Sequence, residues 1–389
     1  MENRVPVAAV LLHDEYTPPN GVYYFRQSAF SQFNGRRLVA ATRRDVDRDL
    51  PTSFPTGPID LPEVPNEQGD RALLDTTVAL LAEHQQPFTL ESPVRLGPAA
   101  NPDTSRFKRV YRVTSAVLSS DFHALLGHGN ATLEETLRTY YTQGPGDPRY
   151  RELAQRVVKD LPERHAKDPL ALALGVAHWL SEQGIYSLKS RHAGAEDPTA
   201  DFLFGDVTGY CVHFAHAGVY MMRALGVPAR VAAGYVFEES GRRGGSTIVL
   251  SGQNAHAWPE VYLTGVGWVV VDIAPQRSLD APPEPPDPDL QNLLGELARG
   301  EQPAMEGAPQ AWSSWVAKAN LLPRLLGQGI LALTALGLLW LYAVKLWRRG
   351  APLVASDRAL GRRLYRRQLD RLSDLSLARN FGEARERFA

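Results

Sequence analysis

Cysteine is almost absent from this chain: Cys211 is the only one among 389 residues. A single thiol excludes an internal disulfide framework, and it excludes any zinc site that needs two or more thiolates from this chain. Three roles remain open for Cys211 at this point. It can be a small buried apolar residue, a ligand in a mixed metal site, or a nucleophile.

The chain also has almost no net charge, since its formal charge at pH 7 is −1. The balance is uneven, however. Residues 345–389 carry 12 Lys and Arg against 5 Asp and Glu, a local +7, so the rest of the chain carries −8. A basic terminal segment is typical of nucleic-acid binding or of a position beside a membrane surface. The residues just before position 345 distinguish nucleic-acid binding from a position beside a membrane.

Long apolar runs are scarce, and one stretch stands out: LLGQGILALTALGLLWLYAV, residues 325–344, holds no charge. Twenty helical residues at 1.5 Å each match the roughly 30 Å of a bilayer core. Trp315, Trp340 and Trp347 lie near the two ends, where interfacial aromatics are expected. We predict a transmembrane helix here, the alternative being a buried core helix. The basic tail, 345–389, is then cytoplasmic and close to anionic lipid rather than bound to nucleic acid.

A secretory signal is not visible at the N-terminus. MENRVPVAAVLLHDEY has a short apolar run but neither a basic n-region nor a small-residue cleavage site. The positive-inside rule nevertheless places residues before the span outside the cytoplasm. Export of so large a region needs a signal, so we expect either a missing start or the opposite orientation.

Local patterns divide the chain into segments. Residues 1–120 read as a small β-rich domain, with a hairpin signal at Asn34-Gly35. Within residues 121–280, Asp147-Pro148 and Asp168-Pro169 each predict a capped helix start. Residues 281–320 form a proline-rich, acidic linker.

Cys211 lies at the predicted start of a further helix, where free backbone N–H groups favour a thiolate. His213 and His216 follow in a C-x-H-x-x-H pattern. On a helix the two histidines share a face from which the cysteine points away, which disfavours a common metal ion. We therefore predict no metal and no cofactor, and interpret both histidines as packing or surface residues.

A cysteine nucleophile needs a base, and the base needs an orienting group. QNAHAWPEVYL offers His256 on a predicted strand, and GWVVVDIAP offers Asp272 near the end of the next. A tight hairpin would pair Asp272 with Glu260, off register from His256, so we expect a stagger or a bulge, for example at Pro259. Glu260 is left as either an orienting or a solvated residue.

These residues resemble a known family. GYCVHFAHAGVYMMRALGVPARVAAGYV and NAHAWPEVYLTGVGWVVVDIAP are similar to the core of the transglutaminase-like superfamily. The resemblance implies that Cys211 is the nucleophile, His256 the base and Asp272 the orienting carboxylate. It also implies an α+β, papain-like thiol core, which here follows the β-rich domain and precedes one transmembrane helix and the basic tail.

The layout as a whole resembles bacterial membrane-anchored transglutaminase-like proteins of the TgpA type, as do YYFRQSAFSQFNGRRL and DPTADFLF. Such proteins carry several membrane helices before the β-rich region, so we expect this sequence to be a piece of a longer protein or to work with a separate upstream membrane subunit. The resemblance implies an inner-membrane location, with the catalytic domain extracytoplasmic and the C-terminus cytoplasmic.

The function that follows is acyl transfer on protein carboxamides or peptide bonds, through a thioester. Its expected partners are a protein or peptide substrate and the lipid bilayer, with no nucleic acid. Two alternatives remain: a cysteine peptidase or amidase acting on envelope or cell-wall peptides, and a non-catalytic envelope scaffold.

Overall fold

The computed structural model describes residues 5–130, 133–189, 192–242, 245–279, 337, 340–346, 365, 368 and 371. Chain contacts divide it into two compact units, Met1–Pro303 and Ala304–Ala389. The predicted linker, 281–320, lies outside the described residues, as do most of the predicted span, 325–344, and most of the tail, 345–389. In the parts of the chain that are described, no helix is both long and apolar enough to cross a membrane.

The larger antiparallel sheet of the first unit has the spatial order β13-β1-β6-β9-β8-β5. Its strands are β13 (Thr247–Ser251), β1 (Pro6–Leu12), β6 (Arg71–Leu80), β9 (Arg109–Leu118), β8 (Ser92–Pro98) and β5 (Ile59–Asp60). The short apolar run at the N-terminus is β1, paired on both sides and buried along almost its whole length. A strand buried on both faces needs a continuous apolar sequence, which explains this run.

A second antiparallel sheet has the order β15-β14-β12-β2-β7. Its strands are β15 (Gly267–Val270), β14 (Ala255–Leu263), β12 (Ala229–Glu238), β2 (Val22–Phe30) and β7 (Thr89–Leu90). The hairpin predicted at Asn34-Gly35 is confirmed, since β3 (Gln32–Phe33) pairs with β4 (Leu38–Val39). A small parallel sheet joins β10 (Ile185–Tyr186) to β11 (Thr208–Gly209) and β16 (Arg277–Ser278).

The segments on either side of residue 120 share both large sheets. Strand β1 pairs with β13, and β2 pairs with β12 over eight residue pairs, from Val231↔Phe30 to Glu238↔Val22. Residues 1–120 are β-rich, as expected, but their strands complete sheets to which the later segment contributes. The two segments therefore form one α+β unit.

The helices are α1 (Glu135–Thr142), α2 (Pro148–Val158), α3 (Pro169–Gln183), α4 (Pro198–Leu203) and α5 (Cys211–Ala224). Both predicted caps are present: the Asp147 side chain accepts from the Arg149 N–H, and that of Asp168 from the Ala171 N–H. Each places a proline in the first helical turn, where its missing N–H costs no hydrogen bond.

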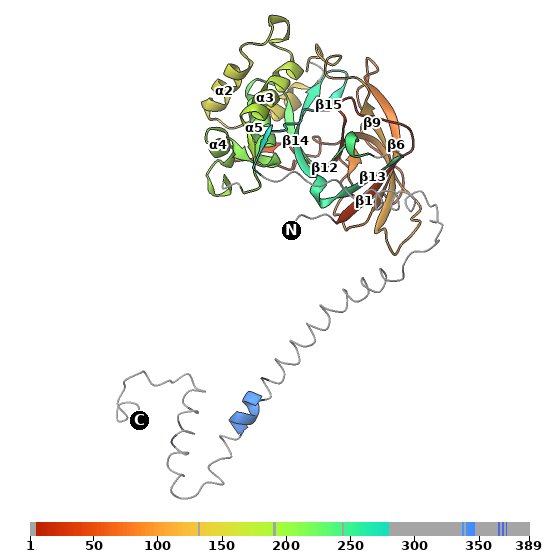
Figure 1. Ribbon diagram of the computed structural model, residues 1–389, viewed down its shortest axis with the longest axis vertical. Coiled ribbons are helices and arrows are strands. Elements are labelled where there is room, and N and C mark those ends of the chain that lie inside the picture. The colour runs from red at the N-terminus through yellow and green to blue at the C-terminus, as the bar shows by residue number, and fades with distance from the viewer. Residues whose placement is uncertain are drawn as a thin grey trace, which may run out of the picture. The chain divides into compact units, whose positions relative to one another are not determined.

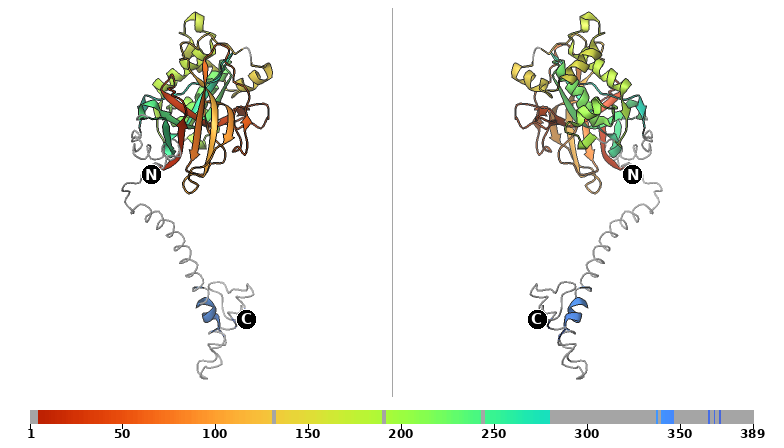
Figure 2. Two further views of the ribbon diagram at one scale, coloured as in Figure 1. Left: turned by 90° about the vertical axis from the view of Figure 1, so that its right-hand side faces the viewer. Right: turned by 90° about the vertical axis from the view of Figure 1, so that its left-hand side faces the viewer.

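Two large apolar cores hold these layers together. One packs the helices, α5 at their centre, against β12, β14 and β15. The other lies between the two sheets, around Tyr23, Phe25, Val78, Val113 and Ile248. Figure 1 shows α2 to α5 on one side of β12, β14 and β15 and the strands β1, β6, β9 and β13 on the other. The turned views of Figure 2 show the same division, with the strands nearest the viewer in one and the helices in the other.

Candidate active site

Cys211 is the first residue of α5 and is half-buried. Tyr210 precedes it with an extended backbone, and its N–H donates to Nδ1 of His213, 3.3 Å away. Gly209 makes room for this arrangement, because an added Cβ there would lie 2.9 Å from the same Nδ1 atom. The Gly-Tyr-Cys sequence thus places the thiol at a helix start, where unpaired N–H groups and the helix dipole favour negative charge.

His256 is the second residue of β14, and Asp272 lies two residues beyond the end of β15. Nε2 of His256 donates to both oxygens of Asp272, at 3.0 Å to Oδ1 and 2.9 Å to Oδ2. Both side chains are about one-fifth exposed. Asn254 supports the turn before His256, since its Oδ1 accepts from the Ser251 N–H at 2.8 Å.

The strand register explains how these two side chains meet. Leu263 pairs with Gly267 and Glu260 with Val270, so Asp272 continues opposite Trp258 rather than opposite Glu260. The predicted bulge is not needed, because β14 pairs through Pro259 with β12 without a shift. Asp272 is then the diagonal neighbour of His256, a separation of ~7–8 Å between backbones that two medium-length side chains bridge.

The thiol of Cys211 lies beside the His256 imidazole, close enough to help raise the pKa of His256. Because Nε2 of His256 is hydrogen-bonded to Asp272, Nδ1 is the ring nitrogen that remains to interact with the Cys211 sulfur. Burial lowers the pKa of His256, but the charge and hydrogen bond of Asp272, followed by those of Cys211, outweigh it and raise the pKa to about 10. The imidazole is therefore an imidazolium at neutral pH, with the sulfur on one side and a carboxylate on the other.

Asp272 has two further donors. The Ile273 N–H donates to Oδ1 at 2.7 Å, and the hydroxyl of Tyr24 donates to Oδ2 at 3.0 Å. Trp258 is fully buried beside them, with its ring stacked on His256 at a centroid distance of 6.1 Å. Tyr24 was not expected at the site from the sequence, because it lies more than 200 residues from Asp272 and reaches it only through strand pairing.

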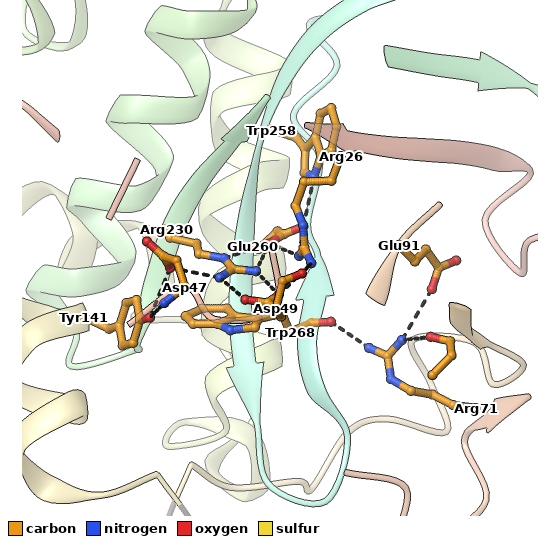
Figure 3. Close-up of polar contacts among 11 residues, drawn as sticks. Arg26, Asp47, Asp49, Arg71, Glu91, Tyr141, Arg230, Trp258, Glu260 and Trp268 are labelled. Atoms are coloured by element: carbon orange, nitrogen blue, oxygen red, sulfur yellow. Dashed lines mark hydrogen bonds and ion pairs between the residues drawn. The ribbon is translucent and has the colours of Figure 1, made fainter. Parts of the chain in front are cut away.

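Glu260 neither orients His256 nor faces solvent. It is 2% exposed and accepts from Arg26 Nη1 at 2.8 and 3.0 Å and from Arg230 Nε at 2.9 Å. Arg230 also pairs with Asp47 and Asp49, as Figure 3 shows. Its guanidinium lies 4.1 Å from the centre of the Trp268 ring. Strand alternation placed Glu260 on the face of His256, but nothing in the sequence indicated its two cationic partners.

His213 and His216 do not join the thiol. Burial lowers the pKa of His213 to about 4, and it also lowers the pKa of His216, whose Nδ1 donates to the Val212 carbonyl at 2.8 Å. Both are therefore neutral at physiological pH, in agreement with the expected packing role. In the described residues, no group of three or more His, Cys, Asp or Glu side chains has a geometry that could hold a metal ion.

The structure thus brings together a half-buried cysteine at a helix start, a strand histidine and an aspartate hydrogen-bonded to that histidine, within an α+β fold. Residues 151–273 match the transglutaminase-like superfamily. This stretch begins inside α2 and ends one residue past Asp272, so it contains all three site residues. Residues 151–273 thus form a transglutaminase-like domain, which confirms the resemblance found in the sequence.

Two curated proteins are similar to part of the chain. A protein-glutamine gamma-glutamyltransferase of Pseudomonas aeruginosa is 37% identical over 136 residues, 34% of this chain and 20% of that protein. The uncharacterized protein YebA of Bacillus subtilis is 40% identical over 80 residues, 20% of this chain and 11% of that protein. The matched region therefore spans a fifth or less of each relative.

Among the solved structures similar to this chain is the periplasmic domain of TgpA from Pseudomonas aeruginosa, at 22% identity and a TM-score of 0.46, covering 77% of this chain and 93% of that one.

Proposed function

We propose that this chain is a thiol acyltransferase in which Cys211 is the nucleophile, His256 the proton carrier and Asp272 the group that orients His256. The observation that carries the proposal is the path from sulfur to carboxylate: the His256 imidazole is hydrogen-bonded to both oxygens of Asp272 and has the Cys211 thiol beside it. Such a path holds an imidazolium beside the sulfur, and an adjacent positive charge stabilises the thiolate that is the reactive form.

The first half-reaction forms a thioester. The Cys211 thiolate attacks the carbonyl carbon of a carboxamide or peptide bond, and the new C–S bond forms as the carbonyl π electrons move to oxygen. When the tetrahedral intermediate collapses, the C–N bond breaks and the imidazolium of His256 gives its proton to the leaving nitrogen. Ammonia or an amine departs, and the acyl group stays on sulfur.

The second half-reaction releases the acyl group. His256, now neutral, takes a proton from an incoming primary amine or water while that nucleophile attacks the thioester carbonyl. When this second tetrahedral intermediate collapses, the C–S bond breaks and the Cys211 thiolate leaves beside the imidazolium. An amine then gives an amide cross-link, and water gives a carboxylate. The backbone N–H of Cys211 is a candidate donor to the developing oxyanion, because N–H groups at a helix start have no partner within the helix.

We place this chemistry outside the cytoplasm of a bacterial cell, at the inner membrane. The support is the uncharged run at residues 325–344 with the basic tail, 345–389, behind it. The corresponding partners are a protein or peptide substrate and the lipid bilayer. A separate upstream membrane subunit, or membrane helices that precede residue 1 in a longer protein, would supply the route of export.

The test uses the full chain in mild detergent with a labelled primary amine and a glutamine-rich acceptor protein. We expect wild-type protein to incorporate the amine and Cys211→Ala to lose incorporation by at least ~10³-fold while it keeps its thermal unfolding temperature. Cysteine-dependent cleavage or deamidation without incorporation would replace acyl transfer with hydrolysis. Equal incorporation by Cys211→Ala would reject the enzyme and favour a scaffold.

A further inference from the structure

We infer that Tyr24 is a positioning residue of the active site, so that β2, which lies outside residues 151–273, is part of the catalytic apparatus. This inference rests on the proposed roles of Cys211, His256 and Asp272. Tyr24 acts through the carboxylate of Asp272 and not on the substrate.

The first argument is the way the carboxylate is held. Both oxygens of Asp272 face Nε2 of His256, at 3.0 and 2.9 Å. Each oxygen also has a separate second donor: Oδ1 accepts from its neighbouring Ile273 N–H, and Oδ2 accepts from the Tyr24 hydroxyl. Rotation about the Cβ–Cγ bond would break both of these bonds. The hydroxyl therefore keeps the second oxygen turned toward the imidazolium.

The second argument is the route by which Tyr24 reaches Asp272. Strand β12 separates β2 from β14, and on the shared face the residue opposite Trp258 is the small Ala232. The Tyr24 and Trp258 rings therefore meet across β12, with centroids 5.1 Å apart. At the bulge between β2 and β12, an added Cβ at Gly234 would lie 2.0 Å from the Phe25 carbonyl oxygen. A glycine there lets β2 approach this closely.

The third argument is the state of the hydroxyl. Tyr24 is 5% exposed, and burial followed by the negative charge of Asp272 raises its pKa well above the ordinary value. Glu238 and Glu91 act in the same direction. The hydroxyl thus stays protonated, and it remains a donor to the carboxylate at every pH at which the site can work. The Trp258 ring packs against both the Tyr24 ring and the His256 ring, at centroid distances of 5.1 and 6.1 Å.

The adjacent residue supplies a matched control. Tyr23 is also a buried-ring tyrosine of β2, and its hydroxyl donates to the Tyr16 carbonyl at 2.7 Å and to Glu239 at 2.5 Å. Tyr24→Phe and Tyr23→Phe each remove one tyrosine hydroxyl that donates to a carboxylate, and each keeps the aromatic ring packed in place. Only Tyr24→Phe touches Asp272.

The measurement is alkylation of Cys211, which is unambiguous because the chain has one cysteine. The full chain is reacted with iodoacetate and with iodoacetamide between pH 6 and 11, and the product is followed by intact mass. An imidazolium beside the sulfur attracts the anionic iodoacetate, so the iodoacetate rate divided by the iodoacetamide rate reports the charge of His256. In wild type this ratio should fall as the pH rises, with a midpoint near pH 10. In His256→Ala the fall should be absent.

We expect Tyr24→Phe to lower this midpoint by about one pH unit, the shift that a tenfold weaker stabilisation of the imidazolium gives. In the amine-incorporation assay the same variant should lower kcat about tenfold with KM unchanged. Tyr23→Phe should match wild type in both. A Tyr24→Phe midpoint equal to that of wild type would overturn the inference.

A double variant provides the second check. If the hydroxyl acts through the carboxylate, Tyr24→Phe added to Asp272→Asn should change the midpoint no further. A further change would show an action independent of Asp272 and contradict the inference. Because alkylation needs no substrate, absence of amine incorporation in wild type would reject the proposed function without deciding the role of Tyr24.

Discussion

Two residues of β14, four positions apart, show how one strand face serves two purposes. His256 lies at the partly exposed end of the strand and meets Asp272 and the thiol. Glu260 lies deeper on the same face, between Arg26 and Arg230. Two buried guanidiniums are tolerated because carboxylates from Glu260, Asp47 and Asp49 surround them. The ion network therefore anchors the strand that carries the base.

Glu260→Gln should destabilise the protein strongly, by about 3–5 kcal/mol, because it leaves two buried guanidiniums short of one negative charge. Denaturant unfolding of the full chain measures this. Glu238→Gln, an exposed change at the end of β12, should cost less than about 0.5 kcal/mol. Equal costs for the two variants would mean that the network adds nothing to stability.

The His256 pKa predicts a pH dependence of stability. Its folded pKa of about 10 is above the unfolded value of 6.5, so the folded state holds the extra proton between these two values. The stabilisation is fully present below pH 6.5 and is lost as pH rises through about 10. The difference in free energy of unfolding between wild type and His256→Gln should therefore shrink over this window. A difference that stays flat for His256→Gln across this window would contradict the raised pKa.

At the scale of elements, the starts of the helices could be predicted from the sequence, because a helix cap is a hydrogen bond between residues only two or three positions apart. The two Asp-Pro pairs begin α2 and α3 as predicted. The β14–β15 hairpin was also predicted, but its register was wrong by two residues, since Asp272 continues opposite Trp258 and not Glu260. The sequence does not show which of Thr264 to Gly267 remain in the turn. The structure leaves three residues, 264–266, unpaired between Leu263 and Gly267.

The two capping aspartates predict a graded effect. Asp168 is buried and accepts from the buried Ala171 N–H and from the Gly127 N–H, so Asp168→Ala leaves both donors without this acceptor. We expect a cost of about 2–3 kcal/mol, against about 0.5–1 kcal/mol for Asp147→Ala, whose cap is on the surface. Thermal unfolding of the two variants checks the order, and Asp168→Asn, which keeps an acceptor oxygen, should recover part of the loss. A smaller loss for Asp168→Ala than for Asp147→Ala would contradict this account.

At the scale of the whole molecule, the sequence indicated the site better than the architecture around it. Cys211, His256 and Asp272 were predicted from short motifs, since the chemistry requires those residue types at those places. The pairings of β1 with β13 and of β2 with β12 join residues more than 190 positions apart, and no local pattern encodes such contacts. Tyr24 and Arg26 were missed for the same reason: both act through a strand pairing that the sequence does not reveal.

Removal of residues 1–120 should prevent folding of the remaining chain. Strand β12 would lose β2, β13 would lose β1, and their backbone groups would be left unpaired along exposed edges. We expect the fragment 121–389 to show no cooperative thermal transition and to aggregate. Co-expression with residues 1–120 should restore both folding and Cys211 alkylation. A fragment that unfolds cooperatively at the temperature of the full chain would show that the transglutaminase-like domain is independent.

The central claim is that His256 activates Cys211 for acyl transfer, and the rate of Cys211 acylation tests it most directly. The full chain is mixed with p-nitrophenyl acetate, the acetyl group is located by peptide mass, and its rate of attachment is compared in wild type, His256→Ala and Asp272→Asn. The account predicts a single acetyl group on Cys211, formed at least ~10²-fold more slowly in His256→Ala and at an intermediate rate in Asp272→Asn. Equal rates in wild type and His256→Ala, or acetylation away from Cys211, would contradict it.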